Sequence, residues 1–95
     1  MKISVILPVY NEEDNLDRLN SELLDVLLTL NHDFEIIYVD DGSTDNSYNI
    51  IEKFSNNSEK IKIIRFKKNF GQTPALMAGV ENSGGEIVVF LDADL

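Results

Sequence analysis

The sequence predicts an α/β fold built on a parallel sheet, and three observations support this prediction. Short apolar runs rich in β-branched residues alternate with longer segments in which apolar residues recur at helical spacing. The order along the chain is β-α-β-α-β-α-β, and parallel strands joined by helices require right-handed crossovers. The chain has 95 residues, 43% of them hydrophobic, which is enough for one domain with a modest core.

Four segments have the composition of strands. The third contains Lys62 and Arg65 between apolar residues, which indicates partial exposure at an edge of the sheet. The fourth is apolar throughout, which predicts a strand buried on both faces. Pro8 cannot donate a hydrogen bond to a neighbouring strand, so regular pairing should fade there. The predicted strands are Ile3–Val9, Phe34–Val39, Ile61–Phe66 and Ile87–Leu91.

The first two helices follow polar turns. The first should begin with Asn11 as its N-cap and run to about Leu30, with leucines at helical spacing against the sheet. Ser43 or Thr44 is the predicted cap of the second helix. That helix should carry three residues inward, namely Tyr48, Ile51 and Phe54.

The third helix should begin near Gln72, with Pro74 tolerated in its first turn. Small residues at Ala75, Ala78 and Gly79 predict a close approach to the sheet. The polar run 82–85 should end the helix.

Charge and composition exclude several classes of function. The chain has 8 basic and 17 acidic residues, a formal net charge of −9, which argues against nucleic acid or anionic lipid as a partner. No cysteine is present for a disulfide or a thiolate metal site. No apolar run approaches the ~18 residues of a membrane span, and the first residues lack the pattern of a signal peptide. We therefore expect a cytoplasmic protein without a membrane segment in this chain.

Polar clusters follow three of the predicted strands. The carboxyl ends of parallel strands share one edge of the sheet, where open α/β folds bind ligands. A lone Asp-x-Asp is more often a solvated strand end, but three clusters on one edge indicate a site. The clusters are Tyr10-Asn11-Glu12, Asp40-Asp41-Gly42 and Asp92-Ala93-Asp94.

The paired acids Asp92 and Asp94 suit a hard cation, Mg²⁺ or Mn²⁺. Two like charges about 4 Å apart repel by roughly 4 kcal/mol at an effective dielectric constant of 20, so a bound diphosphate would require such a metal. Asp41 could accept a hydrogen bond from a nucleotide base. Alternatively it could serve as a turn or cap residue, a role open equally to Asp40 or Asp45.

Other nucleotide-binding and phosphoryl-transfer patterns are missing. The first strand is followed by neither Gly-x-Gly-x-x-Gly nor a P-loop. Haloacid-dehalogenase-type phosphatases place Asp-x-Asp after their first strand, whereas here the pair follows the fourth. Receiver domains carry acids after the first strand and a phosphoacceptor after the third, where this chain has Lys67 and Lys68. Sugar-nucleotide pyrophosphorylases need a glycine-rich loop in place of residues 8–10.

Four motifs follow one another along the chain: Pro8-Val9-Tyr10-Asn11-Glu12, Asp40-Asp41-Gly42-Ser43-Thr44-Asp45, Asn69-Phe70-Gly71 and Asp92-Ala93-Asp94. In this order they resemble family 2 glycosyltransferases, most closely the polyprenyl-phosphate branch that includes dolichol-phosphate mannosyltransferase-like enzymes. The resemblance covers nearly the whole chain. One departure is Gln72, which stands where the branch often has a basic residue.

The resemblance implies the amino-terminal part of a GT-A fold, a three-layer sandwich with strand order 3-2-1-4. It implies a metal-dependent inverting transfer of a sugar from a UDP- or GDP-type donor to an acceptor, with a polyprenyl phosphate as one candidate. Pro8, Tyr10, Glu12, Asp41 and Asp92 would bind the nucleotide, with Asp41 at the base. Asp92 and Asp94 would hold the Mg²⁺ or Mn²⁺.

The same resemblance implies that residues 1–95 are the nucleotide-sugar-binding part of a transferase domain and stop after the Asp-x-Asp motif. The general base is then expected downstream of Leu95, so the 95 residues should bind nucleotide with little or no transfer. The full-length protein would be associated with the cytoplasmic face of a membrane. The apolar strand Ile87–Leu91 would lie at an edge and favour self-association. Two alternatives stay open: a non-catalytic nucleotide-binding or interaction module, and a nucleotidyl- or phosphoryl-transfer enzyme.

Overall fold

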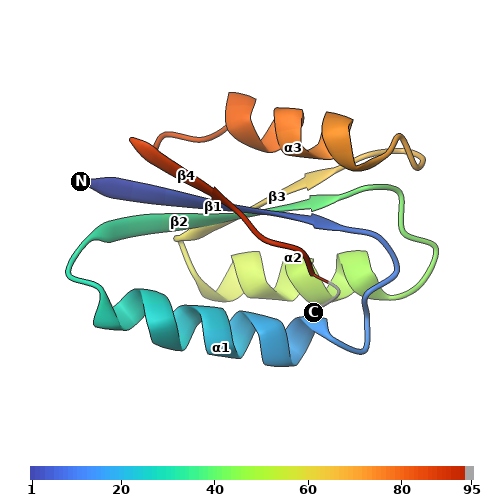
Figure 1. The fold of residues 1–95 in the computed structure, drawn as a ribbon. Helices are drawn as coiled ribbons and strands as arrows, with labels where there is room; N and C mark the ends of the chain where they lie inside the picture. The colour runs from blue at the N-terminus through green and yellow to red at the C-terminus, as the bar shows by residue number, and fades with distance from the viewer. Residues whose placement is uncertain (94–95) are drawn as a thin grey trace.

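The computed structural model describes residues 1–93 and has a four-stranded sheet with the order β3-β2-β1-β4 (Figure 1). The strands are β1 (Lys2–Val9), β2 (Asp33–Asp40), β3 (Ile61–Arg65) and β4 (Ile87–Phe90). All three strand pairs are parallel. The predicted fold class, strand order and edge position of β3 are confirmed.

Three helices cover the two faces of the sheet. These are α1 (Leu16–Thr29), α2 (Ser47–Asn57) and α3 (Gln72–Glu81). Figure 1 shows α3 on one face and both α1 and α2 on the other, which makes three layers. Within residues 1–93, no helix combines the length and the apolar character needed to cross a membrane.

Each face of the two central strands packs into its own apolar cluster, because successive strand residues point to opposite sides. The cluster under α3 contains Ile6, Ile37, Val39 and Ala75. The larger cluster, under α1 and α2, includes Tyr38, whose hydroxyl donates to Asn20 Oδ1 at 2.7 Å. The core members of this larger cluster are Val5, Leu7, Val9, Leu16, Leu19, Leu27, Phe34, Ile36, Tyr38, Ile51, Ile61 and Ala93.

The small face of α3 allows the predicted close approach to β1. A Cβ at Gly79 would collide with Ile6 Cγ2 and lie 3.1 Å from Ile6 Cδ1. Ala75 on the same face is fully buried. This contact fixes the position of the helix whose first turn borders the site.

The predicted starts of α1 and α2 were wrong. The N-cap residues are Asn15 and Asn46, in place of Asn11 and of Ser43 or Thr44. Asn11 instead adopts a left-handed conformation with φ of 53°, which asparagine tolerates better than most residues. Its polar groups, like those of the two predicted caps, contact the neighbouring loop, so they are not available at a helix end.

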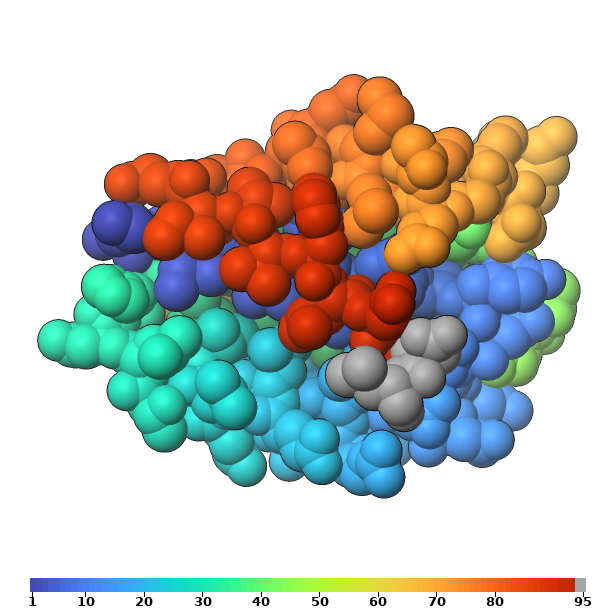
Figure 2. All heavy atoms as spheres, viewed as in Figure 1, coloured from blue at the N-terminus to red at the C-terminus, as the bar shows by residue number. Residues whose placement is uncertain are grey.

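The prediction that the strand Ile87–Leu91 is buried on both faces was also wrong for β4, which comprises Ile87–Phe90. The side chains of β4 are 36–53% exposed, because the strand pairs only with β1 and lies at the edge of the sheet. In Figure 2 it lies uncovered on the face toward the viewer. Pairing of β1 with β4 ends at Ile6, whereas pairing with β2 continues through Pro8 to Val9, so pairing fades before Pro8 on one side only.

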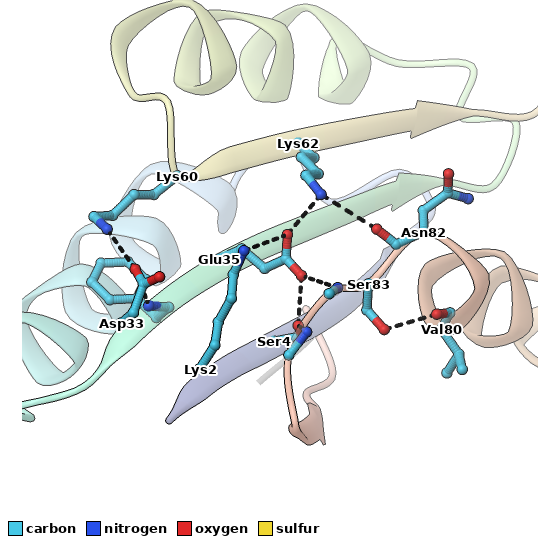
Figure 3. A network of polar contacts seen from close by, with 12 residues as sticks. Lys2, Ser4, Asp33, Glu35, Lys60, Lys62, Val80, Asn82 and Ser83 are labelled. Carbon is cyan, nitrogen blue, oxygen red and sulfur yellow. Dashed lines mark hydrogen bonds and ion pairs between the residues drawn. The ribbon is translucent and has the colours of Figure 1, made fainter.

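A buried carboxylate organises the amino-terminal edge of the sheet (Figure 3). Glu35 Oε2 accepts hydrogen bonds of 2.6 Å from the Ser4 hydroxyl and from Gly84 N, while Lys62 Nζ lies 2.8 Å from Oε1. Lys2 adds a longer ion pair of 3.8 Å. Burial acts to raise the pKa of Glu35, but these hydrogen bonds and charges outweigh it and lower the pKa to about 2. The carboxylate therefore joins β1, β2, β3 and the turn that leads into β4.

Candidate functional site

A cavity of about 310 Å³ opens at the carboxyl edge of the sheet, where β1, β2 and β4 end. All five residues predicted to bind nucleotide line it. Val9 and Ala93 also line it, and one wall is formed by the loop before α3 together with the first residue of that helix. The predicted residues are Pro8, Tyr10, Glu12, Asp41 and Asp92, and the wall residues are Asn69, Gly71 and Gln72.

The loop after β1 is held by the loop after β2. Asn11 Oδ1 accepts hydrogen bonds from Thr44 N at 2.8 Å and Asp45 N at 3.2 Å, and Asn11 N donates to Ser43 Oγ at 2.9 Å. One residue further, Glu12 N donates to Ser47 Oγ at 2.9 Å. Tyr10 and Glu12 thus flank a fixed residue and face the cavity, with Tyr10 45% exposed.

The three acids after β2 have different roles. Asp40 Oδ1 accepts from Ser43 N at 3.2 Å, which stabilises the turn. Asp45 Oδ1 accepts from Ser47 N at 2.8 Å at the start of α2. Burial acts to raise the pKa of Asp45, but its hydrogen bonds with Ser47 and with the N–H of Glu13 lower it. The turn and cap roles that the sequence left open for Asp41 are therefore filled by its neighbours.

Asp41 instead binds the loop before α3. Its carboxylate accepts hydrogen bonds from Phe70 N at 2.8 Å, Asn69 Nδ2 at 2.9 Å and Gly71 N at 3.0 Å. The residue is only 4% exposed, although it lines the cavity. Gly42 makes room for this contact, because a Cβ there would lie 2.5 Å from Asn69 N.

Asp92 is exposed at the mouth of the cavity and contacts the first turn of α3. Gln72 Nε2 donates to Asp92 Oδ1 at 3.2 Å. Asp94, the second predicted metal ligand, lies outside the described residues. Among residues 1–93, no group of three or more His, Cys, Asp or Glu side chains could hold a metal ion.

Sequence reasoning singled out Asn69-Phe70-Gly71 as a motif but gave none of its residues a place in the site. The sequence feature that could have placed these residues in the site is the motif itself, together with the loop glycines Gly42 and Gly71. The missing information was the partner: Asn69 and Asp41 are 28 positions apart. The sequence predicts Gln72 as the start of α3, which is confirmed, and as a departure from the family pattern, but it does not predict the contact of Gln72 with Asp92.

The model of the family described as "Glycosyl transferase family 2" matches residues 4–95. The chain belongs to this family. Among curated members, it is 41% identical to an uncharacterized glycosyltransferase of Synechocystis over 95 residues, which cover 100% of this chain and 30% of that protein. It is 42% identical to the undecaprenyl-phosphate 4-deoxy-4-formamido-L-arabinose transferase of Proteus mirabilis, covering 99% of this chain and 29% of that enzyme. The chain thus spans less than a third of the length of these family 2 relatives.

Two similar solved structures have the same arrangement of elements. S. aureus TarS 1–349 in complex with UDP-GlcNAc superposes with a TM-score of 0.78 at 35% identity, over 99% of this chain and 27% of that one. A mannosyltransferase of Pyrobaculum calidifontis in complex with GDP-Man and Mn²⁺ has a TM-score of 0.75 at 28% identity, over 97% and 27% of the two chains. The expected amino-terminal part of a GT-A glycosyltransferase fold is confirmed.

Proposed function

We propose that residues 1–95 form the donor-binding part of a glycosyltransferase that transfers a sugar from a nucleoside-diphosphate donor. The observation that carries this proposal is the cavity at the ends of β1, β2 and β4, which brings Tyr10, Asp41 and Asp92 together. Open α/β sheets bind ligands at this edge. Family membership and the nucleotide-sugar complexes of two similar structures support it.

The proposed roles follow the positions of the side chains around the cavity. Pro8, Tyr10 and Glu12 would contact the nucleoside on the β1 side. Asp41 would accept a hydrogen bond from the base. Asp92, at the mouth, would face the diphosphate together with Asp94.

The charge of the cavity supports a role for Mg²⁺ or Mn²⁺. The described lining contains three acids, Glu12, Asp41 and Asp92, and neither lysine nor arginine. These carboxylates would repel a diphosphate unless a cation accompanied it. Carboxylate oxygens suit these hard cations, so Asp92 and Asp94 would hold one. When bound, such an ion stabilises negative charge on the departing nucleoside diphosphate.

Transfer with inversion and a polyprenyl-phosphate acceptor are proposed from family membership, supported by relatives that act on undecaprenyl phosphate. A cytoplasmic location stays a prediction. So does self-association through Ile87–Leu91, which the exposed apolar side chains of β4 favour. A clean monomer in light scattering at tens of micromolar, a typical range for weak association, would contradict it.

The proposal is tested by calorimetric titration of the chain with UDP, GDP and their sugar conjugates, with and without Mn²⁺. We expect binding that depends on the metal. Asp92→Ala should weaken it by about tenfold or more, since removing even the partners of metal ligands costs 10–100-fold in affinity.

Asp25→Ala is the matched control, because Asp25 is an exposed acid on α1 and does not line the cavity. It removes the same charge and should leave binding unchanged. Absent binding, or binding that is indifferent to both Mn²⁺ and Asp92, would contradict the proposal and favour an interaction module.

A further inference from the structure

A second cavity, of about 370 Å³, opens between the loop after β2 and the end of the edge strand β3. It lies at the same edge of the sheet as the first cavity, but the two share none of their described lining residues. Its volume is in the range of pockets that hold small ligands. The lining residues are Gly42, Ser43, Thr44, Arg65, Phe66 and Lys67.

The two cavities differ in charge. The described lining of the first contains three acids and neither lysine nor arginine, whereas that of the second contains Arg65 and Lys67 and no acid. Asp40, the register partner of Arg65 on β2, is 1% exposed and does not line the second cavity. Lys68 adds a third positive charge next in the sequence. Three of the eight basic residues in a chain of net charge −9 thus lie within four consecutive positions.

These three cations are not neutralised by ion pairs. Within residues 1–93, none of the three has an acidic side chain at ion-pair distance, in contrast to Lys2, Arg18, Lys60 and Lys62. Two of them lie over aromatic rings instead: the Arg65 guanidinium is 4.0 Å from the centre of the Tyr48 ring, and the Lys68 ammonium is 5.2 Å from that of Phe70. Such contacts orient a cation without cancelling its charge.

The lining of the second cavity also offers a hydroxyl donor. Ser43 Oγ accepts a hydrogen bond from Asn11 N at 2.9 Å, so its own O–H can donate to a ligand. The main-chain N–H groups of Ser43, Thr44 and Phe66 all donate within the protein. A ligand would therefore be held by side chains, namely two cations and a hydroxyl. Charged donors of this kind suit an anion with several acceptor oxygens, such as phosphate.

We infer that this second cavity binds the phosphate group of a small phosphomonoester. The planar guanidinium of Arg65 matches two phosphate oxygens, and Lys67 supplies a compact charge. A phosphomonoester carries a charge of about −1.5 to −2 at pH 7, which the two cations of the lining balance. The net charge of −9 opposes an anionic membrane surface, so a small free molecule is favoured over a lipid headgroup. This site needs no metal and does not rest on the proposed nucleotide site.

The test is a titration of the ¹⁵N-labelled chain with methyl phosphate, without Mn²⁺ and at constant ionic strength, followed by the NMR shifts of the amides. We expect saturable shifts at Gly42, Thr44 and Phe66. Dimethyl phosphate carries one charge and has the phosphodiester linkage of lipids. It should bind about tenfold or more weakly, the scale of one hydrogen bond to a charged group.

Three outcomes would overturn the inference. Shifts that do not saturate, and that chloride at equal ionic strength reproduces, would show an effect of salt alone. Saturable shifts confined to the residues of the first cavity would place the anion there. Sedimentation with phosphatidylglycerol vesicles but not with phosphatidylcholine vesicles, without saturable binding of methyl phosphate, would identify a lipid surface.

Variants test whether the charge of the lining is responsible. Lys67→Ala should weaken methyl phosphate binding by about tenfold, while Lys67→Arg, which keeps the charge, should retain most of the affinity. Lys53→Ala is the matched control, because Lys53 is an exposed lysine on α2 that does not line the cavity. It removes the same charge and should leave the affinity unchanged. Equal losses in Lys67→Ala and Lys53→Ala would reveal only a general effect of net charge and would overturn the inference.

Discussion

Two buried carboxylates stand at opposite ends of the same sheet, and their surroundings differ. Glu35 at the amino-terminal edge is 2% exposed and pairs with two lysines. Asp41 at the carboxyl-terminal edge is 4% exposed and is held by three N–H groups, with no lysine or arginine pairing with it in the described part of the chain.

The difference separates a structural carboxylate from one suited to a ligand. Positive charges cancel the charge of Glu35, and its donors come from β1, β3 and the turn before β4, so the fold itself uses this carboxylate. N–H dipoles stabilise Asp41 without cancelling its charge. The Asp41 carboxylate therefore retains its negative charge and an open acceptor position beside the cavity.

The largest expected effect is on folding stability. Glu35→Ala would leave Ser4, Lys62 and Gly84 N without their common partner. Removing one member of a buried ion pair costs about 3 kcal/mol or more in the free energy of unfolding. Urea denaturation followed by circular dichroism measures it, and Glu35→Gln, which retains an acceptor, should lose less.

Arg18→Ala is the control for this change. Arg18 and Glu22 form an ion pair of 3.8 Å on the surface of α1, with both side chains at least 70% exposed. Exposed pairs contribute little, so no measurable loss is expected. Equal losses of unfolding free energy in Glu35→Ala and Arg18→Ala would contradict the stabilising role of the hydrogen bonds and ion pairs around Glu35.

The same carboxylate predicts how stability depends on pH. The pKa of Glu35 is lowered from 4.5 to about 2 in the folded chain. Its contribution is fully present above pH 4.5 and is lost as the pH falls toward 2, because the unfolded state takes up the proton first. The loss amounts to about 3 kcal/mol. Glu35→Gln should flatten this part of the curve in urea titrations between pH 2 and 7, and parallel curves for the two proteins would contradict the assignment.

A smaller effect is expected from one glycine at the carboxyl-terminal edge. Gly42 has a φ of 74°, and a Cβ there would lie 2.5 Å from Asn69 N and also collide with the Lys68 carbonyl carbon. Gly42→Ala should displace the loop that Asp41 holds. We expect a loss of about 2 kcal/mol in stability from strain and overpacking, together with weaker nucleotide binding.

Gly84→Ala is the matched control at the other edge. A Cβ there would make only ordinary contacts of 3.8 Å with Glu35 and Lys2. Stability should change little and nucleotide binding not at all. Unchanged nucleotide affinity in Gly42→Ala would break the link between the Asp41 loop and the cavity.

The sequence was sufficient for the features that depend on periodicity. Strand positions, the small face of α3 and the meeting of three polar strand ends follow from alternation, residue size and the common direction of parallel strands. These rules are local, or they follow from topology. They therefore placed Tyr10, Asp41 and Asp92 around one cavity.

The contacts made by individual side chains could not be predicted in the same way. Asn11 is a good N-cap by composition, yet its oxygen accepts from Thr44 and Asp45, more than 30 positions away. Asp41 is likewise satisfied by a loop 28–30 positions later. Such pairings depend on how loops from different strands meet, which no periodicity encodes.

The left-handed residue Asn11 has a consequence for the thermodynamics of ligand capture. Because Asn11 joins the loop after β1 to the loop after β2 before any nucleotide binds, both of these loops are already ordered in the free protein. Nucleotide binding then costs little conformational entropy in these two loops. The affinity for a nucleotide at the carboxyl edge of the sheet should therefore depend more on these preorganised loops than on loop closure around the bound nucleotide.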